Sequence, residues 1–184
     1  MSGAWFETIE SRDVYEGFAR VRVDRVRTPD GEEVEREVVV RHDAVAVVPV
    51  TPDGRVLLLH QYRQPVGRPL IELPAGLLDV AGEDPADAAQ RELIEELGMR
   101  AGTLTPLTTF WNSAGWSTER TTVYLGRELQ PAPPPDGFTP KAEEAHLEVV
   151  SLAVEDALTA VHDGEITDAK TVIGLLLAAR RLGG

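Results

Sequence analysis

The stretch from Gly76 to Met99 constrains this chain more than any other, because it joins a glycine-bounded loop to a short helix with clear ends. Asp84 is a good N-cap residue, Pro85 suits the first helical position, and Gly98 stands where many helices end. Apolar side chains recur between these ends at three- and four-residue steps, at Ala86, Ala89, Leu93 and Leu97. This spacing predicts a helix that buries one apolar stripe.

Three glutamates share another face of this predicted helix. Glu92, Glu95 and Glu96 stand at i, i+3 and i+4, a spacing at which like charges repel by about a few tenths of a kcal/mol. Their charge near the C-terminus also opposes the helix dipole. A hard divalent cation would turn this repulsion into attraction, because Mg²⁺ prefers oxygen ligands and shares them with substrate phosphates. The alternative interpretation is a solvated acidic face.

The residues from Glu83 onward follow the spacing of a known motif. Glu83 is followed by seven residues and then by Arg91-Glu92-Leu93-Ile94-Glu95-Glu96-Leu97-Gly98-Met99. This pattern resembles the Nudix box, Gly-x5-Glu-x7-Arg-Glu-U-x-Glu-Glu-x-Gly-U, in which U is a bulky apolar residue. One departure is that six residues, not five, separate Gly76 from Glu83. A loop before a helix should accommodate one extra residue.

The resemblance implies hydrolysis of a diphosphate with the help of divalent cations, Mg²⁺ or Mn²⁺, with two or more ions per site. It makes Glu92 and Glu96 the principal metal ligands, with Glu95 as an additional or water-mediated ligand and the Ala75 carbonyl as a contributor. Arg91 would orient a glutamate, although an exposed arginine paired with a neighbouring glutamate is the alternative. The chemistry agrees, since phosphoryl transfer needs neutralised phosphate oxygens and a positioned water.

Neighbouring segments are similar to the ADP-ribose pyrophosphatase branch of this family, namely residues 60–65, His-Gln-Tyr-Arg-Gln-Pro, and residues 72–76, Glu-Leu-Pro-Ala-Gly. This similarity implies that Arg63 contacts the diphosphate or the terminal ribose and that Glu72 belongs to the substrate site. Arg36, in an N-terminal hairpin, matches a further arginine of that branch. Guanidinium groups suit phosphate oxygens. A salt bridge on a strand face is the alternative for each arginine.

Other positions are assigned through the same resemblance. Glu119 matches a substrate-side glutamate, and Glu143 or Glu144 matches a general base or extra metal ligand, with a solvated acidic loop as the alternative. Phe18 is a candidate for stacking on adenine, with a core position as the alternative. This branch typically has Ser-Pro-Gly-Phe beyond the box, whereas this chain has Ala114 in place of the proline. We expect Trp116 to reshape the base or ribose pocket there.

The hydrophobic pattern predicts strands alternating with helices, which implies a layered α/β or α+β domain. We expect strands at 14–26, 35–40, 44–50, 55–62, 70–73, 103–111, 121–125 and 148–152. Further helices are expected at 154–161 and 168–182, and turns at 28–31 and 51–54, while five prolines make 131–140 an extended loop. The resemblance specifies an α/β/α sandwich around a mixed sheet. Residues 1–43 would form antiparallel strands, a candidate dimerisation element, and 44–184 the Nudix domain.

Composition narrows the partners. The net charge of −13 disfavours nucleic acid and anionic membranes. The chain has no cysteine and no long apolar run, so we expect a cytoplasmic location. The family resemblance implies a homodimer. The leading prediction is metal-dependent hydrolysis of ADP-ribose to AMP and ribose 5-phosphate. The alternatives are another nucleoside diphosphate sugar, a dinucleotide or a nucleoside triphosphate as substrate, or a module that senses ADP-ribose without hydrolysis.

Overall fold

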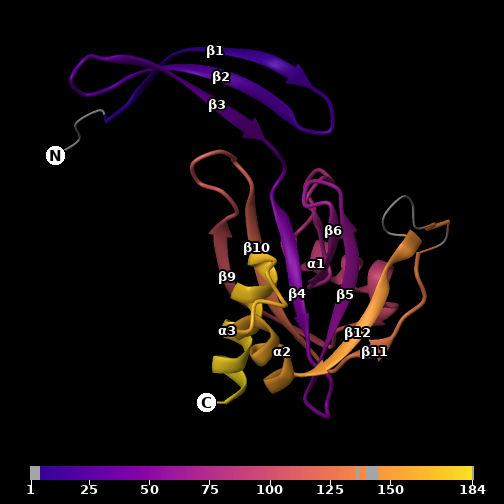
Figure 1. Ribbon diagram of the computed structural model, residues 1–184. Helices are drawn as coiled ribbons and strands as arrows, with labels where there is room; N and C mark the ends of the chain where they lie inside the picture. The colour runs from indigo at the N-terminus through magenta and orange to yellow at the C-terminus, as the bar shows by residue number, and fades with distance from the viewer. Residues whose placement is uncertain (1–4, 136, 140–144, 184) are drawn as a thin grey trace. The chain divides into compact units, whose positions relative to one another are not determined.

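The computed structural model describes residues 5–135, 137–139 and 145–183, and these form two compact units. One unit contains residues 5–43 together with Trp111–Arg120, and the other contains Ala44–Phe110 together with residues 121–183. Figure 1 shows both units along the chain. Each unit is described by itself.

The first unit is a three-stranded antiparallel sheet with the order β1-β2-β3. Its strands are β1 (Glu7–Glu16), β2 (Arg20–Arg27) and β3 (Glu33–Val40). The turn predicted at 28–31 is confirmed, because Gly31 has a φ of 90° and its N–H donates to the Thr28 carbonyl at 3.0 Å. The single strand predicted at 14–26 is wrong. The chain reverses between Glu16 and Arg20, and no proline or Asn-Gly pair marked that turn.

The second segment of this unit is tied to the last strand of the sheet. The Val39 N–H donates to the Trp116 carbonyl at 2.9 Å, and the Thr118 N–H donates to the Val39 carbonyl at 3.0 Å. The two pairings create an isolated parallel bridge between Val39 and Ser117. Residues that are far apart in the sequence are therefore neighbours here.

The second unit contains a mixed sheet with the order β7-β4-β10-β9, in which β4 runs parallel to β10 and antiparallel to β7. Its strands are β4 (Ala44–Pro49), β7 (Ala75–Leu77), β9 (Thr103–Trp111) and β10 (Arg120–Arg127). An antiparallel sheet with the order β12-β5-β6 comprises β5 (Arg55–Arg63), β6 (Arg68–Glu72) and β12 (Glu148–Ala153). A small antiparallel pair joins β8 (Met99–Arg100) to β11 (Gln130–Pro131).

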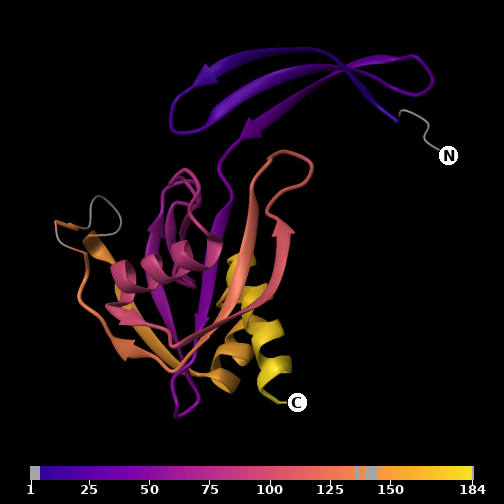
Figure 2. The same ribbon diagram turned by 180° about the vertical axis from the view of Figure 1, so that it is seen from behind.

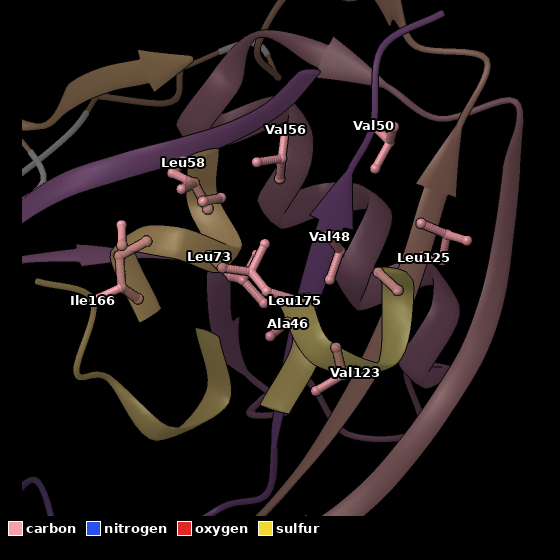
Figure 3. Packing of buried hydrophobic residues seen from close by; sticks show 13 residues of the cluster. Ala46, Val48, Val50, Val56, Leu58, Leu73, Val123, Leu125, Ile166 and Leu175 are labelled. Carbon is pink, nitrogen blue, oxygen red and sulfur yellow. The ribbon is translucent and has the colours of Figure 1, made fainter. Parts of the chain in front are cut away.

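Strand β4 is buried on both faces, as its unbroken apolar sequence predicts. Val45 and Val47 pack in one cluster with the stripe of helix α1 (Pro85–Leu97). Ala46 and Val48 belong to a second cluster with α2 (Val154–His162) and α3 (Ala169–Leu182), shown in Figure 3. The predicted α/β/α sandwich around a mixed sheet is therefore confirmed, and Figure 2 shows α1 on the side of the sheet away from α3.

The other predicted elements of this unit are found within a few residues of their expected ends, which is the usual uncertainty of helix and strand boundaries. The short strands β7, β8 and β11 were not predicted. Pro131, expected in an extended loop, pairs with Met99 instead, and positions 136 and 140 of that loop lie outside the described residues. No helix in the part of the chain that the structure describes is long and apolar enough to cross a membrane.

Candidate active site

Helix α1 begins and ends where the sequence predicts. The Asp84 side chain accepts a hydrogen bond from the Ala86 N–H at 2.8 Å, and Pro85 occupies the first turn. Gly98 adopts the left-handed conformation with a φ of 63°, and its N–H donates to the Ile94 carbonyl at 3.0 Å. These caps fix the register of the helix, and therefore the face on which its glutamates stand.

Arg91 lies at the centre of the acidic face. Its Nε and Nη2 donate to the two carboxylate oxygens of Glu83 at 3.1 and 3.2 Å. Its Nη1 donates to Glu92 at 2.5 Å and to Glu95 at 3.4 Å. Hydrogen bonding to Glu83 is the main reason that the pKa of Arg91 is raised, although partial burial opposes the shift. One guanidinium therefore organises three carboxylates, which still leaves an excess of negative charge.

The other glutamates meet the loop that precedes the helix. The Ala75 N–H donates to Oε2 of Glu96 at 2.9 Å. The Glu92 carboxylate lies against Gly76 so closely that a Cβ at that position would clash with it. Glycine is required here for close approach rather than for its backbone angles. Glu92 and Glu96 are thus one helical turn apart and both lie at the backbone of residues 75–76.

The residues of this face fit a divalent cation by the chemistry of their donors. Carboxylate and carbonyl oxygens are the ligands that Mg²⁺ and Mn²⁺ prefer. Within the described ranges, no three Asp, Glu or His side chains are already grouped as a metal cage. Arg91 and the Ala75 N–H hold the carboxylates in the present arrangement. Ion binding would therefore exchange some of these hydrogen bonds for metal contacts.

A second charged cluster surrounds Glu72, whose side chain is only 1% exposed at the end of β6. Arg63 holds it as a fork, with Nε on Oε1 and Nη2 on Oε2, both at 2.7 Å. Lys170 also donates to Oε2 of Glu72 and bonds Asp168 at 2.9 Å. Burial alone would raise the pKa of Glu72, but the hydrogen bonds from Arg63 and the charge of Lys170 outweigh it and lower the pKa.

The structure brings Arg63 and Glu72 together as a salt bridge between adjacent strands, the alternative considered for Arg63. Lys170 is the member of this cluster that sequence reasoning missed. Its partner Glu72 is 98 residues away, so no local spacing connects them. The only local signal is Asp168, which caps α3 by accepting from the Thr171 N–H at 3.0 Å.

A pocket of about 400 Å³ lies within the unit that contains the three-stranded sheet. It is lined by Arg36, Glu37, Val38, Trp111, Ala114, Gly115, Trp116, Ser117 and Thr118. The two tryptophans are each 55% exposed. The guanidinium of Arg120 lies 5.5 Å from the centre of the Trp111 ring and pairs with Asp43 at 2.5 Å. The pocket therefore combines exposed aromatic rings with the Arg36 cation.

The pocket gathers some of the predicted substrate residues and not others. The pocket is lined by Arg36, by Trp116 and by Ala114, the residue that replaces the proline of the ADP-ribose branch. Trp111, which was not predicted, also lines it. Phe18 and Glu119 are not among its lining residues. Phe18 is 82% exposed with Arg41 4.8 Å from its ring centre, so the core alternative for Phe18 is wrong.

The predicted general-base candidates Glu143 and Glu144 lie outside the described residues. Their role stays a prediction. Glu95, the other catalytic candidate, lies on α1 beside Arg91.

The α/β/α sandwich carries on one helix an acidic face whose oxygen donors suit divalent cations. Comparison with family models is more specific. The NUDIX domain matches residues 40–172, and the nucleoside diphosphate sugar hydrolase N-terminal domain matches residues 6–39. The chain belongs to the Nudix family, whose hydrolases generally use a divalent metal.

Several relatives extend over most of the chain. An ADP-ribose pyrophosphatase of Mycobacterium tuberculosis is 41% identical over 173 residues, covering 93% of this chain and 82% of the relative. An ADP-ribose pyrophosphatase of Bacillus subtilis is 36% identical, covering 92% and 90%. A methanol dehydrogenase activator of Bacillus methanolicus is 32% identical, covering 94% and 93%. A crystal structure of an ADP compounds hydrolase has a TM-score of 0.86 over 100% of this chain and 97% of that one, at 23% identity, which supports the fold.

Proposed function

We propose that this protein hydrolyses the diphosphate bond of ADP-ribose and releases AMP and ribose 5-phosphate. The observation that carries the proposal is the pair Glu92 and Glu96, held against the backbone of residues 75–76 on a capped helix. The choice of ADP-ribose rests on the two pyrophosphatase relatives at 41% and 36% identity. The net charge of −13 repels a diphosphate at long range, so local cations must offset it.

In this proposal Glu92, Glu96 and the Ala75 carbonyl hold the cations, which we expect to be Mg²⁺ or Mn²⁺ with two or more ions per site. Bound cations would neutralise the phosphate oxygens and activate the attacking water. Arg91 keeps the carboxylates on one face through its hydrogen bonds to Glu83, Glu92 and Glu95. The proton of the attacking water is assigned to a carboxylate, Glu95, Glu143 or Glu144.

Substrate recognition is assigned to two sets of residues. The Arg63 fork uses Nε and Nη2 on Glu72, and we assign Nη1 to an oxygen of the diphosphate or ribose. The pocket with Arg36, Trp111 and Trp116 is assigned to the adenine, because exposed indole rings can stack on the flat face of a nucleobase. Glu119 and Phe18 keep their predicted substrate-side roles on the family resemblance alone.

A second candidate substrate is another nucleoside diphosphate sugar. It is favoured by Ala114, which lines the pocket where the ADP-ribose branch has proline, and by the family of the N-terminal residues 6–39. A dinucleotide, a nucleoside triphosphate and a sensing module without turnover are the remaining alternatives. The sensing module is disfavoured because the box glutamates are all present.

A substrate panel tests these proposals directly. ADP-ribose, GDP-mannose, NADH and ATP are each incubated with the full chain and either Mg²⁺ or Mn²⁺, and products are separated by ion-exchange chromatography. ADP-ribose should have the highest kcat/KM, with AMP as the nucleotide product. A higher value for GDP-mannose would move the assignment to nucleotide sugars. Binding of ADP-ribose without turnover of any compound would favour the sensing module.

We also propose that the protein is a homodimer and that it is located in the cytoplasm. Exposed apolar side chains on the N-terminal strands, including Val14 and Tyr15, support a role for residues 1–43 in self-association. Light scattering of the purified chain should give twice the 20.0 kDa mass of one chain. A monomer at micromolar concentration would contradict the dimer.

A further inference from the structure

The first turn of α3 forms hydrogen bonds with two consecutive residues, the last residue of β6 and the one that follows it. The Leu73 N–H donates to Oγ1 of Thr171 at 2.8 Å, and Lys170 donates to the Glu72 carboxylate. Thr171 is fully buried and is itself fixed by Oδ2 of Asp168 at 2.6 Å. Glu72 and Leu73 come just before Ala75, whose N–H donates to Glu96 of α1. This turn of α3 is therefore bonded to the residues that lead into the backbone of the proposed active site.

Lys170 is an unusual residue to find in this position. Its side chain is only 16% exposed, and burying an ammonium group is costly unless it is fully paired. A buried ion pair is weak evidence for stability, because apolar residues of similar volume often serve as well or better. The presence of a cation here therefore calls for an explanation other than packing.

The geometry around Glu72 supplies that explanation. The Glu72 carboxylate accepts both hydrogen bonds of the Arg63 fork, so any movement of that carboxylate would turn the guanidinium with it. Lys170 places a second cation on the same carboxylate. It donates to Oε2, the oxygen that also accepts a hydrogen bond from Nη2 of Arg63. Asp168 bonds Lys170 at 2.9 Å but also caps α3, whose N-terminal dipole offsets part of its charge. Because Lys170 also holds Oε2 of Glu72, the carboxylate is fixed in place and the guanidinium of Arg63 keeps its orientation.

We propose that Lys170 is a positioning residue for substrate binding, which acts through Glu72 to orient the guanidinium of Arg63 toward the diphosphate. This inference rests on the proposed function, because it assumes that Arg63 binds the substrate. Lys170 does not itself contact substrate in this arrangement. Its removal should therefore weaken substrate binding more than it slows the chemical step.

The test uses Lys170→Met, which keeps most of the length of the unbranched side chain and removes the charge. Binding of α,β-methylene ADP-ribose, which cannot be hydrolysed at the diphosphate, is measured by calorimetry without metal and again with Mg²⁺. The Kd of Lys170→Met should rise about tenfold or more in both series, as expected for a charge-assisted bond. Lys170→Arg should restore the Kd to within about threefold, because the cation returns. KM for ADP-ribose should rise with the Kd, whereas kcat should fall less than about threefold.

The matched control is Arg180→Met, which removes the same charge from an exposed position on the same helix. Its Kd should equal that of the parent. A Kd for Lys170→Met within twofold of the parent would overturn the inference, and so would a Lys170→Arg variant that binds as weakly as Lys170→Met. An Arg180→Met variant that is as weak as Lys170→Met would also overturn it, by showing a general charge effect.

A double-mutant cycle covers the case in which Lys170→Met does not fold. The double variant Glu72→Gln/Lys170→Met removes the buried carboxylate together with the lysine, so no buried charge loses its partner. It is compared with Glu72→Gln alone. Because Lys170 acts through Glu72, the two should bind the analogue equally within twofold. A further tenfold loss in the double variant would overturn the inference. If the parent neither binds the analogue nor hydrolyses ADP-ribose, the proposed function fails instead, so the two failures are distinguishable.

Discussion

The amide N–H of Ala75 donates a 2.9 Å hydrogen bond to Oε2 of Glu96, which joins the loop before α1 to the last turn of that helix. One helical turn earlier, the Glu92 carboxylate lies against the next residue, Gly76, so closely that a Cβ there would clash with it. The two glutamates with the strongest claim to bind metal are therefore anchored on the same short piece of backbone. This arrangement accounts for acidic residues at a helix end where the dipole disfavours them.

Glu96→Gln should separate the structural role of this residue from its proposed metal role. The glutamine oxygen can still accept the Ala75 N–H, so the midpoint of thermal unfolding should change little. Loss of the charged ligand should lower kcat by about 100-fold or more at saturating Mg²⁺. The control is Glu155→Gln on α2, an exposed residue outside the acidic face. Full activity in Glu96→Gln would remove Glu96 from the metal site.

Gly76→Ala tests the close approach of Glu92. A Cβ at this position clashes with the Glu92 carboxylate, so the side chain or the loop must move. We expect a loss of about 1–3 kcal/mol in the free energy of unfolding, as for overpacked sites, and a fall in kcat of about tenfold or more. Urea unfolding and steady-state kinetics measure the two effects.

The control for Gly76→Ala is Gly183→Ala, where a Cβ would meet its nearest neighbour at an ordinary 3.5 Å. That variant should match the parent in both measurements. If Gly76→Ala also matched the parent, the carboxylate of Glu92 would not be confined as the structure has it.

The local part of this architecture could be predicted from sequence, and the reasons are physical. Asp84, Pro85 and Gly98 each act on the backbone within one turn, so the ends of α1 follow from nearest neighbours. The buried strand β4 is equally legible, because an unbroken run of small and branched apolar residues fits a strand covered on both faces.

What escaped prediction depends on contacts between distant residues or on weak local signals. Strand β1 is almost entirely exposed and polar, so its sequence lacks the alternation that marks a half-buried strand. Val39 pairs with the segment around Trp116, and Lys170 pairs with Glu72 across 98 residues. Such pairs arise only when the fold is complete.

The pH dependence of stability should report the ionisation of Glu72. Its pKa is lowered in the folded protein by Arg63 and Lys170, despite burial. A lowered pKa contributes stability above the ordinary glutamate pKa, roughly 4.3, and this contribution is lost as the pH falls through the folded value. The difference in free energy of unfolding between the parent and Glu72→Gln should therefore be constant from pH 7 to about 5 and shrink below roughly 4.

Urea unfolding at half-unit pH steps measures this difference. The control is Glu165→Gln, an exposed glutamate between α2 and α3, where a surface substitution should change the free energy of unfolding by less than about 0.5 kcal/mol. A difference for Glu72→Gln that is unchanged down to pH 3 would show that Arg63 and Lys170 do not stabilise the ionised carboxylate.

Trp116→Ala tests the assignment of the exposed pocket to the adenine ring. Trp116 is 55% exposed and lines the pocket beside Arg36. Loss of base stacking typically costs about 1–3 kcal/mol, so KM for ADP-ribose should rise roughly 5- to 150-fold with kcat nearly unchanged. The control is Leu176→Ala on α3, which removes an apolar side chain that is 53% exposed and far from the pocket in sequence.

Product inhibition gives a second test of the same assignment. Ribose 5-phosphate, which has no base, should inhibit the parent and Trp116→Ala equally, whereas AMP should inhibit the variant less. An unchanged KM for ADP-ribose, or equal loss of inhibition by both products, would rule out stacking of the base on Trp116.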